Sequence, residues 1–149
     1  MDREEDRARE DALRQRVEAR DDQYEDIKAA TSDALALRID ATDHPLCKDD
    51  EEAQQIQALL RRLRIAIEHV RGHRSDELTE SLIRLHGCLE GLKGELLPAR
   101  ASLTDPSTIG QYDVLDLAAQ SARQTRIAME LEVAVRNARA ALDVEWGSQ

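Results

Sequence analysis

Hydrophobic residues recur every three or four positions in several stretches of the chain, which is the pattern of amphipathic helices. The clearest stretch predicts a helix over residues 49–72, in which Asp49 and Glu52 have the spacing of a capping box. The next predicts a helix over 75–97, with Ser75 as its N-cap. Since only a few residues separate the two, they are expected to form an antiparallel hairpin.

Longer helical stretches flank this hairpin on both sides. The first predicts a helix over residues 3–39 that stops before Pro45, because the residue preceding a proline is held out of helical geometry. The other predicts a helix over 113–145, reached through an irregular connection over 98–112. Together the four helices predict an all-α fold: a four-helix bundle, or a bundle with a protruding coiled-coil arm.

The helix over 113–145 carries apolar residues on two opposite faces. One face carries Leu117, Ile127, Leu131, Val135, Ala138 and Leu142. At about 100° per residue, the opposite face carries Leu115, Ala122, Met129, Val133, Ala140 and Val144. A surface helix needs one apolar face, so this helix is either central to its domain or shared with another subunit. We interpret the second set as a candidate interface of a homo-oligomer.

The first 26 residues are dominated by charge. Oppositely charged residues stand four apart, as with Glu5 and Arg9, and each such pair stabilises a helix by about 0.2–0.5 kcal/mol. The pattern predicts a charged helical arm over 1–26 and a bundle domain over 27–149. Anchors three, four and seven positions apart are typical of helix-in-groove binding. The candidate partner-binding seam of the arm is Leu13, Val17, Tyr24 and Ile27.

Composition supports the helical interpretation. Of 149 residues, 41% are hydrophobic and 35% are charged, so the chain can bury a core beneath strongly charged surfaces. Aromatic residues make up only 2%, and there are six glycines and three prolines. β-Sandwiches, barrels and doubly wound sheets depend on aromatic and β-branched strands and on many turns, so the composition argues against them.

The chain is acidic, with 31 Asp and Glu against 21 Lys and Arg and a formal net charge of −10. Nucleic-acid backbones and anionic membranes select basic patches, so the balance argues against direct binding to either. No apolar run reaches the length of a membrane span, and the charged start is unlike a secretory signal. Cys47 and Cys88 form no CxxC pair, which indicates reduced thiols in the cytoplasm or within an assembled particle.

Candidate chemical sites are few. His69 and His73 have the i, i+4 spacing of metal-binding histidines, but Gly72 interrupts the helix and no carboxylate or thiol lies within a turn on the same face. No Glu-x-x-His motif of the di-iron type occurs, and no serine or cysteine has a recognisable nucleophile context. We therefore expect no metal, no cofactor, no small-molecule substrate and no catalytic residue, and a protein that is not an enzyme.

Three glycines, Gly87, Gly91 and Gly94, fall near one side of the 75–97 helix. Each costs about 1 kcal/mol of helix stability relative to alanine. Because the leucine pattern continues past them, we interpret them as a flat face for the close approach of another backbone, in preference to an early helix end near Gly87. Trp146 either docks on the bundle or binds a partner, and the sequence leaves both open.

These features favour a non-enzymatic assembly protein that binds protein partners through apolar helix faces. The class includes adaptors, helical chaperones and structural subunits of larger particles, phage and viral particles among them. The alternative is an acidic inhibitor that mimics a polyanion and occupies the basic nucleic-acid-binding groove of a partner protein, using the carboxylates of residues 2–26. Salt distinguishes the two, because it screens binding by charge far more than helix packing.

Overall fold

The computed structural model describes residues 3–105, 107, 110 and 112–147, except for the side chains of 16–21 and 39–43. No β-strand occurs in this described part of the chain, so the predicted all-α class is confirmed. Its helices are α1 (Arg3–Asp43), α2 (Glu51–Val70), α3 (Asp76–Gly94), α4 (Arg100–Thr104) and α6 (Val114–Gly147).

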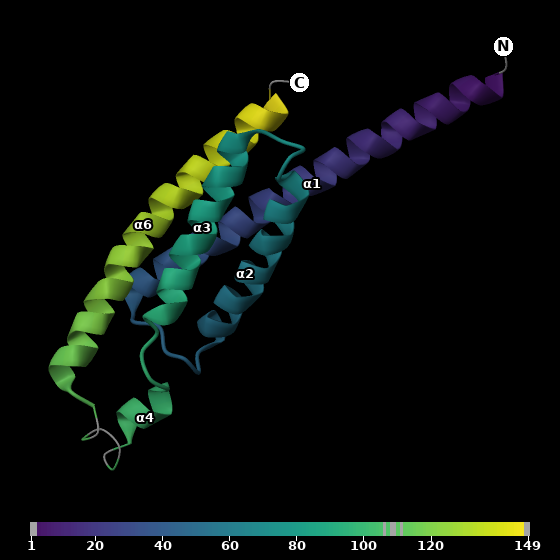
Figure 1. The fold of residues 1–149 in the computed structure, drawn as a ribbon. Helices are drawn as coiled ribbons and strands as arrows, with labels where there is room; N and C mark the ends of the chain where they lie inside the picture. The colour runs from purple at the N-terminus through teal and green to yellow at the C-terminus, as the bar shows by residue number, and fades with distance from the viewer. Residues whose placement is uncertain (1–2, 106, 108–109, 111, 148–149) are drawn as a thin grey trace.

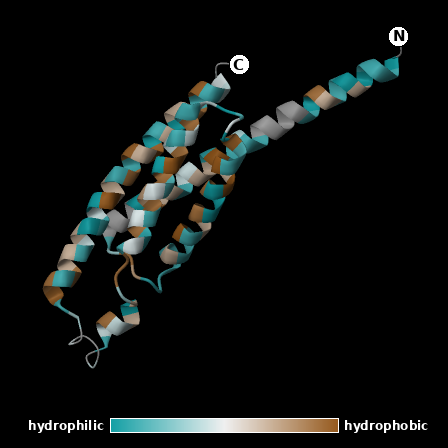
Figure 2. Ribbon diagram, in the orientation of Figure 1, coloured by the Kyte–Doolittle hydropathy of each residue, from teal (hydrophilic) through white to brown (hydrophobic). Residues whose placement is uncertain are grey.

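Four of these helices form the bundle. α1 packs against α2 and α6, and α3 packs against the same two helices, so each has two neighbours (Figure 1). α2 and α3 form the predicted hairpin. The core between the helices is almost entirely aliphatic, with a leucine-rich contribution from the hairpin. Figure 2 shows hydrophobic residues interleaved with hydrophilic ones along every bundle helix, as expected where one face is buried.

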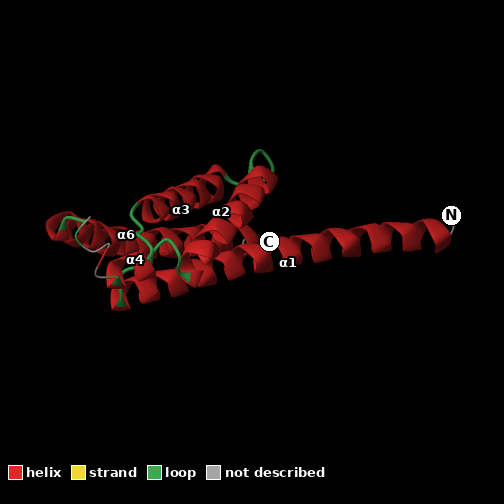
Figure 3. Ribbon diagram, turned by 90° about the horizontal axis from the view of Figure 1, so that it is seen from below, coloured by secondary structure: helices red, strands yellow, loops and turns green. Residues whose placement is uncertain are grey.

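The N-terminal half of α1 extends past the end of the bundle. Figures 1 and 3 show it leaving the other helices on the side where the C-terminus lies. Side chains 3–15 are all exposed, whereas Ile27, Ala30, Ala34 and Leu37 further along the same helix are buried. The helix is continuous through both parts, so the arm is a direct extension of a bundle helix.

Local contacts explain where the hairpin helices begin and end. The Ser75 hydroxyl accepts a hydrogen bond from the Leu78 amide at 3.3 Å, which confirms Ser75 as the N-cap of α3. Between α2 and α3, Gly72 adopts φ +78°, a left-handed conformation that favours glycine after a helix end. The expected capping box of Asp49 and Glu52 is wrong: the N-cap of α2 is Asp50, and its side chain makes no cap hydrogen bond.

Two other features differ from the prediction: the end of α3 and the structure of the segment that follows it. α3 ends at Gly94 rather than at 97, because the Leu97 amide donates to the Leu46 carbonyl and the Lys48 amide donates to the Leu97 carbonyl. These bonds hold the following segment in an extended conformation. Within the expected irregular connection over 98–112, the chain forms the short helix α4.

Candidate protein-interaction surface

The side of α6 that faces away from the bundle carries an exposed apolar stripe. Its larger members are exposed by 79% at Leu115, 63% at Met129, 56% at Val133 and 66% at Val144. Ala122 and Ala140 are exposed as well. We call these six residues the outer stripe of α6, and they are the residues that the sequence predicted as an oligomer interface. All six side chains are exposed, in contrast to the buried residues of the core.

The opposite face of α6 is buried in the bundle. Gln124, Ala128, Leu131, Ala134, Val135, Ala138 and Leu142 lie against α1 and α3. α6 is therefore a peripheral helix with two neighbours, and not the central helix that its two apolar faces also allowed. Its second face has no counterpart within the described chain.

A groove between α3 and α6 borders the outer stripe. It consists of a hollow of about 480 Å³ and a neighbouring one of about 340 Å³, which share Ser81, Arg84 and Asn137 as lining residues. Val133 of the outer stripe lines the first hollow, and Ala140 and Val144 line the second. The stripe and the α3/α6 groove therefore form one continuous surface.

Two of the three glycines of α3, Gly87 and Gly91, line this groove. A methyl group added at Gly91 would be 3.7 Å from the Ile127 side chain, whereas one added at Gly87 or Gly94 would meet no atom within 4 Å. The helix runs on to Gly94, so an early end near Gly87 is excluded. The close approach of another backbone, which the sequence favoured, does not occur within the described chain, and the backbone at Gly87 is open.

The residues of the partner-binding seam predicted for the arm do not share one environment in the structure. Leu13 is exposed, while the side chain of Val17 lies outside the described residues. Ile27 is 1% exposed and belongs to the core, so its assignment to a free partner-binding seam is wrong. Tyr24 is partly buried against the same core and is also a bundle residue. The boundary of the arm therefore lies before Tyr24 and not after residue 26.

A cluster around Trp146 fixes α1 at the point where the arm begins. The Tyr24 hydroxyl donates to the Asp143 carboxylate at 2.9 Å, and the Tyr24 and Trp146 rings lie 5.7 Å apart. The Arg74 guanidinium stacks over Trp146 at 4.3 Å and forms an ion pair with Glu145 at 3.7 Å. The hydrogen bond to Asp143 raises the pKa of Tyr24. Trp146 thus docks on the bundle, which resolves the alternative that the sequence left open.

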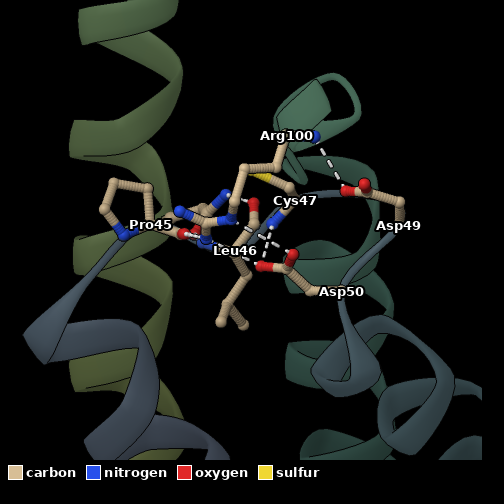
Figure 4. A network of polar contacts seen from close by, with 7 residues as sticks. Pro45, Leu46, Cys47, Asp49, Asp50 and Arg100 are labelled. Carbon is tan, nitrogen blue, oxygen red and sulfur yellow. Dashed lines mark hydrogen bonds and ion pairs between the residues drawn. The ribbon is translucent and has the colours of Figure 1, made fainter. Parts of the chain in front are cut away.

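At the other end of the bundle, Arg100 joins two loops (Figure 4). Its guanidinium donates to Asp50 at 2.9 Å, and its backbone amide donates to Asp49 at 2.8 Å. The hydrogen bond from Arg100 holds the pKa of Asp50 below its ordinary value. Asp50 also accepts from the Cys47 amide at 3.2 Å. These bonds engage both carboxylates, which explains why Asp49 does not cap α2 as expected.

The same cluster contains the residues best placed for a metal among those that the structure describes. Potential ligand atoms of Cys47, Asp49 and Asp50 lie within 4.8 Å of one another. However, the Arg100 guanidinium already pairs with Asp50, and burial raises the pKa of the Cys47 thiol, which disfavours the thiolate that binds metals. We assign the cluster a structural role. Sequence reasoning missed it because its members come from two loops that only the fold brings together.

A further groove of about 690 Å³ lies between α1 and α2. Ile65 contributes an exposed apolar side chain to it, and the lining carries two acidic residues, Asp22 and Asp26, and two basic ones, Arg62 and Arg74. Arg62 pairs with Asp33 at 2.7 Å, and Arg74 belongs to the Trp146 cluster. The groove therefore offers no unbalanced charge that would select an ionic ligand.

None of the helices in the described part of the chain combines the length and the apolar content that a bilayer crossing requires. In comparisons with known proteins, no family model, curated protein or solved structure matches the chain. The candidate function therefore follows from the surfaces described above.

Proposed function

We propose that the protein is a non-enzymatic assembly protein that self-associates through the outer stripe of α6 and leaves its N-terminal arm available to a second protein. The observation that carries this proposal is the outer stripe itself. Four large apolar side chains on it are more than half exposed, on a helix whose other face already fills the core. Single exposed apolar residues are ordinary, but a continuous row rimmed by polar residues marks a protein interface.

Charge and cysteine usage suit this function. A net charge of −10 keeps an assembly protein soluble and unattractive to nucleic acid. The free thiols Cys47 and Cys88 fit a reducing compartment such as the cytoplasm. Polyanion mimicry, the alternative function, needs an exposed face on which carboxylates are not interrupted by basic residues. Residues 2–26 carry eleven acidic residues but also six arginines interspersed among them up to Arg20, so the arm does not present charge of one sign.

The test is the mass of the protein in solution. Light scattering at micromolar concentration should give a multiple of 16.8 kDa for the wild type. Met129→Glu and Val133→Glu should return it to a single-chain mass with unchanged helicity, because a buried unpaired carboxylate is costly. The matched control is Ile65→Glu, since Ile65 is 53% exposed on α2, away from the stripe, and its substitution should leave the mass unchanged. A fully helical wild type with a single-chain mass would refute the proposal.

A further inference from the structure

The α3/α6 groove continues the outer stripe onto a second helix, and much of its lining is small. Its small lining residues are Ser81, Gly87, Cys88, Gly91, Ala134 and Ala141. A methyl group added at Gly87 would meet no atom within 4 Å, so the α3 backbone is accessible there. A groove between two packed helices that is lined by small residues can accept a further helix at a short interaxial distance.

Glycine at position 87 is not explained by the packing of the described chain. Gly87 lies in the interior of α3, where glycine weakens a helix relative to alanine. Gly91 faces the Ile127 side chain of α6, and Gly94 is the last residue of the helix. Gly87 has neither a neighbour within reach nor a helix end beside it, so its missing side chain leaves room for atoms from outside the chain.

The outer stripe is flanked by basic residues, although the chain as a whole is acidic. At about 100° per residue, the charged residues nearest to the centre of the stripe are Arg126 and Arg136, and both are exposed. Arg136 also pairs with Glu132, yet its side chain remains 78% exposed. The formal net charge of the chain is −10. The exposed face of α6 therefore matches a surface that is apolar in part and acidic in part.

The α3/α6 groove is a surface of that kind. Its charged lining residues are three glutamates and one arginine, namely Glu77, Glu80, Glu130 and Arg84. Its apolar edge comes from three residues of the outer stripe itself. Two outer stripes placed directly against each other would bring four arginines together, whereas a stripe placed in the groove meets glutamates. The groove between α1 and α2 carries equal numbers of Asp and Arg residues and lacks this excess of acidic charge.

We infer that the occupant of the α3/α6 groove is α6 of a second copy of the chain, which lays its outer stripe into the groove and approaches the α3 backbone at Gly87. This inference rests on the proposed self-association and names the surface that receives the stripe. In a two-fold dimer both copies use the same patch, so the contact occurs twice. Each α6 then touches both α6 and α3 of the other copy.

The area that a stable dimer needs supports a contact that includes α3. From Leu115 to Val144 the outer stripe is about 43 Å long, and two helix surfaces about 10 Å wide would bury roughly 900 Å² in total. Stable and specific interfaces bury about 1,200–2,000 Å². A contact between the two α6 helices alone falls short of this range. Seating in the groove adds α3 surface from both copies.

Glycine substitutions in the full-length chain test the approach at Gly87. Gly87→Gln puts a long side chain where the second copy's helix lies. Gly94→Gln is the matched control, because Gly94 belongs to the same helix and is equally open but does not line the groove. Sedimentation equilibrium at a series of concentrations gives the dimer dissociation constant. We expect Gly87→Gln to raise it by about tenfold or more with unchanged helicity, and Gly94→Gln to change it by less than about twofold.

Charge reversal tests which surfaces meet. The double variant Arg126→Glu/Arg136→Glu sets glutamates against the glutamates of α3. The double variant Glu77→Lys/Glu80→Lys sets lysines against the two arginines. Each variant alone therefore repels its own copies, whereas every contact in an equal mixture joins opposite charges. We expect dissociation constants about tenfold above the wild type for each variant alone, and within about threefold of it for the mixture.

A control separates this local effect from the change in net charge. Arg61→Glu/Arg64→Glu adds the same negative charge at exposed positions of α2, which do not line the α3/α6 groove. Its dissociation constant should stay within about twofold of the wild type. Circular dichroism of every variant verifies that the helices are intact. Both arginines are reversed together so that the result does not depend on the relative direction of the two α6 helices.

The outcomes separate the inference from the proposed function. If light scattering gives only single chains for the wild type, the proposed function fails, whatever the groove does. If the wild type associates but the mixture does not recover, or if Gly87→Gln associates as well as Gly94→Gln, the second copy lies elsewhere and the inference is wrong while self-association stands. If the α2 control weakens association as much as Arg126→Glu/Arg136→Glu, net charge governs association and the inference is again wrong.

Discussion

Gln124 and Leu46 exchange two hydrogen bonds across the bundle. The Leu46 amide donates to the Gln124 side-chain oxygen at 2.8 Å, and the Gln124 side-chain nitrogen donates back to the Leu46 carbonyl at 2.8 Å. The same nitrogen also donates to the Glu95 carbonyl. Gln124 is 1% exposed, so a single side chain of α6 satisfies backbone groups of two loops that are remote from each other in sequence.

Gln124→Met is therefore expected to destabilise the fold by about 2–3 kcal/mol, because the buried Leu46 amide loses its acceptor. The free energy of unfolding in urea measures this. Gln120→Met is the matched control: Gln120 lies one turn earlier and makes one partly buried hydrogen bond to the Leu96 carbonyl at 2.9 Å. We expect its cost to stay near 1 kcal/mol. Equal losses for the two variants would contradict the special role of Gln124.

The pairing of Arg100 with Asp50 should make stability depend on acid. The pKa of Asp50 in the folded chain lies below its ordinary value, chiefly because Arg100 donates to it. The pair therefore stabilises the folded state above the ordinary carboxyl pKa, and this contribution disappears as the pH falls through the lower, folded value. Arg100 is half exposed, so solvent screens the pair and the contribution is small.

Arg100→Gln checks this expectation. The variant should be less stable than the wild type at neutral pH, and the difference should shrink as the pH is lowered below the folded pKa of Asp50. Urea unfolding at a series of pH values gives the comparison. A difference that remains constant with pH would mean that Arg100 acts through packing and not through its charge.

The glycines give a prediction with opposite signs at two positions. Gly72→Ala should cost about 1 kcal/mol, because an alanine at φ +78° is strained. Gly87→Ala should stabilise the single-chain fold by up to about 1 kcal/mol, since the added methyl group meets nothing within 4 Å in a helix. Thermal unfolding of both variants in a Met129→Glu background, where self-association is absent on our proposal, isolates the effects. Destabilisation by Gly87→Ala there would contradict an open face.

Much of the fold follows from the sequence because the helices depend on local patterns. The hairpin, the Ser75 cap and the two faces of α6 rest on spacings of three and four residues, which the bundle preserves. The outer stripe could be recognised for the same reason. The sequence did not decide whether α6 is a central or a peripheral helix. The structure decides it, because α6 packs against α1 and α3 and leaves its other face exposed.

The errors arose where distant segments meet. Asp49 fits a cap by sequence, but Arg100, about fifty residues later, engages both Asp49 and the neighbouring Asp50. Ile27 fits a thin seam by sequence, yet α1 enters the bundle before it, so the residue is buried. No local spacing reveals where a continuous helix passes from solvent into a core.

Trp146 is the chain's one tryptophan, so its fluorescence reports on the cluster that anchors α1. Arg74→Met removes the guanidinium that stacks over the indole at 4.3 Å, and we expect an altered emission and a loss of about 0.5–2 kcal/mol. Arg71→Met, at an exposed position just past α2, is the control and should change neither. An unchanged spectrum in Arg74→Met would show that the stacking is absent in solution.

The boundary of the arm can be tested by comparing two deletions. Removing residues 1–20 takes away none of the contacts described for Tyr24 or Trp146, so the melting temperature should shift by no more than about 3 °C. Removing residues 1–26 also deletes Tyr24 and leaves buried Ile27 at a frayed helix end, so the loss should be several times larger.

Hydrogen exchange on the full-length protein supplies the complementary measurement. Amides of residues 5–15 should exchange orders of magnitude faster than those of α2 and α3, because an isolated charged helix opens locally while the core does not. Protection should rise at about Tyr24, where α1 meets the Trp146 cluster. If residues 5–15 were as protected as the hairpin, or if both deletions were equally harmless, the arm would not be the free, partner-binding segment that the proposed function requires.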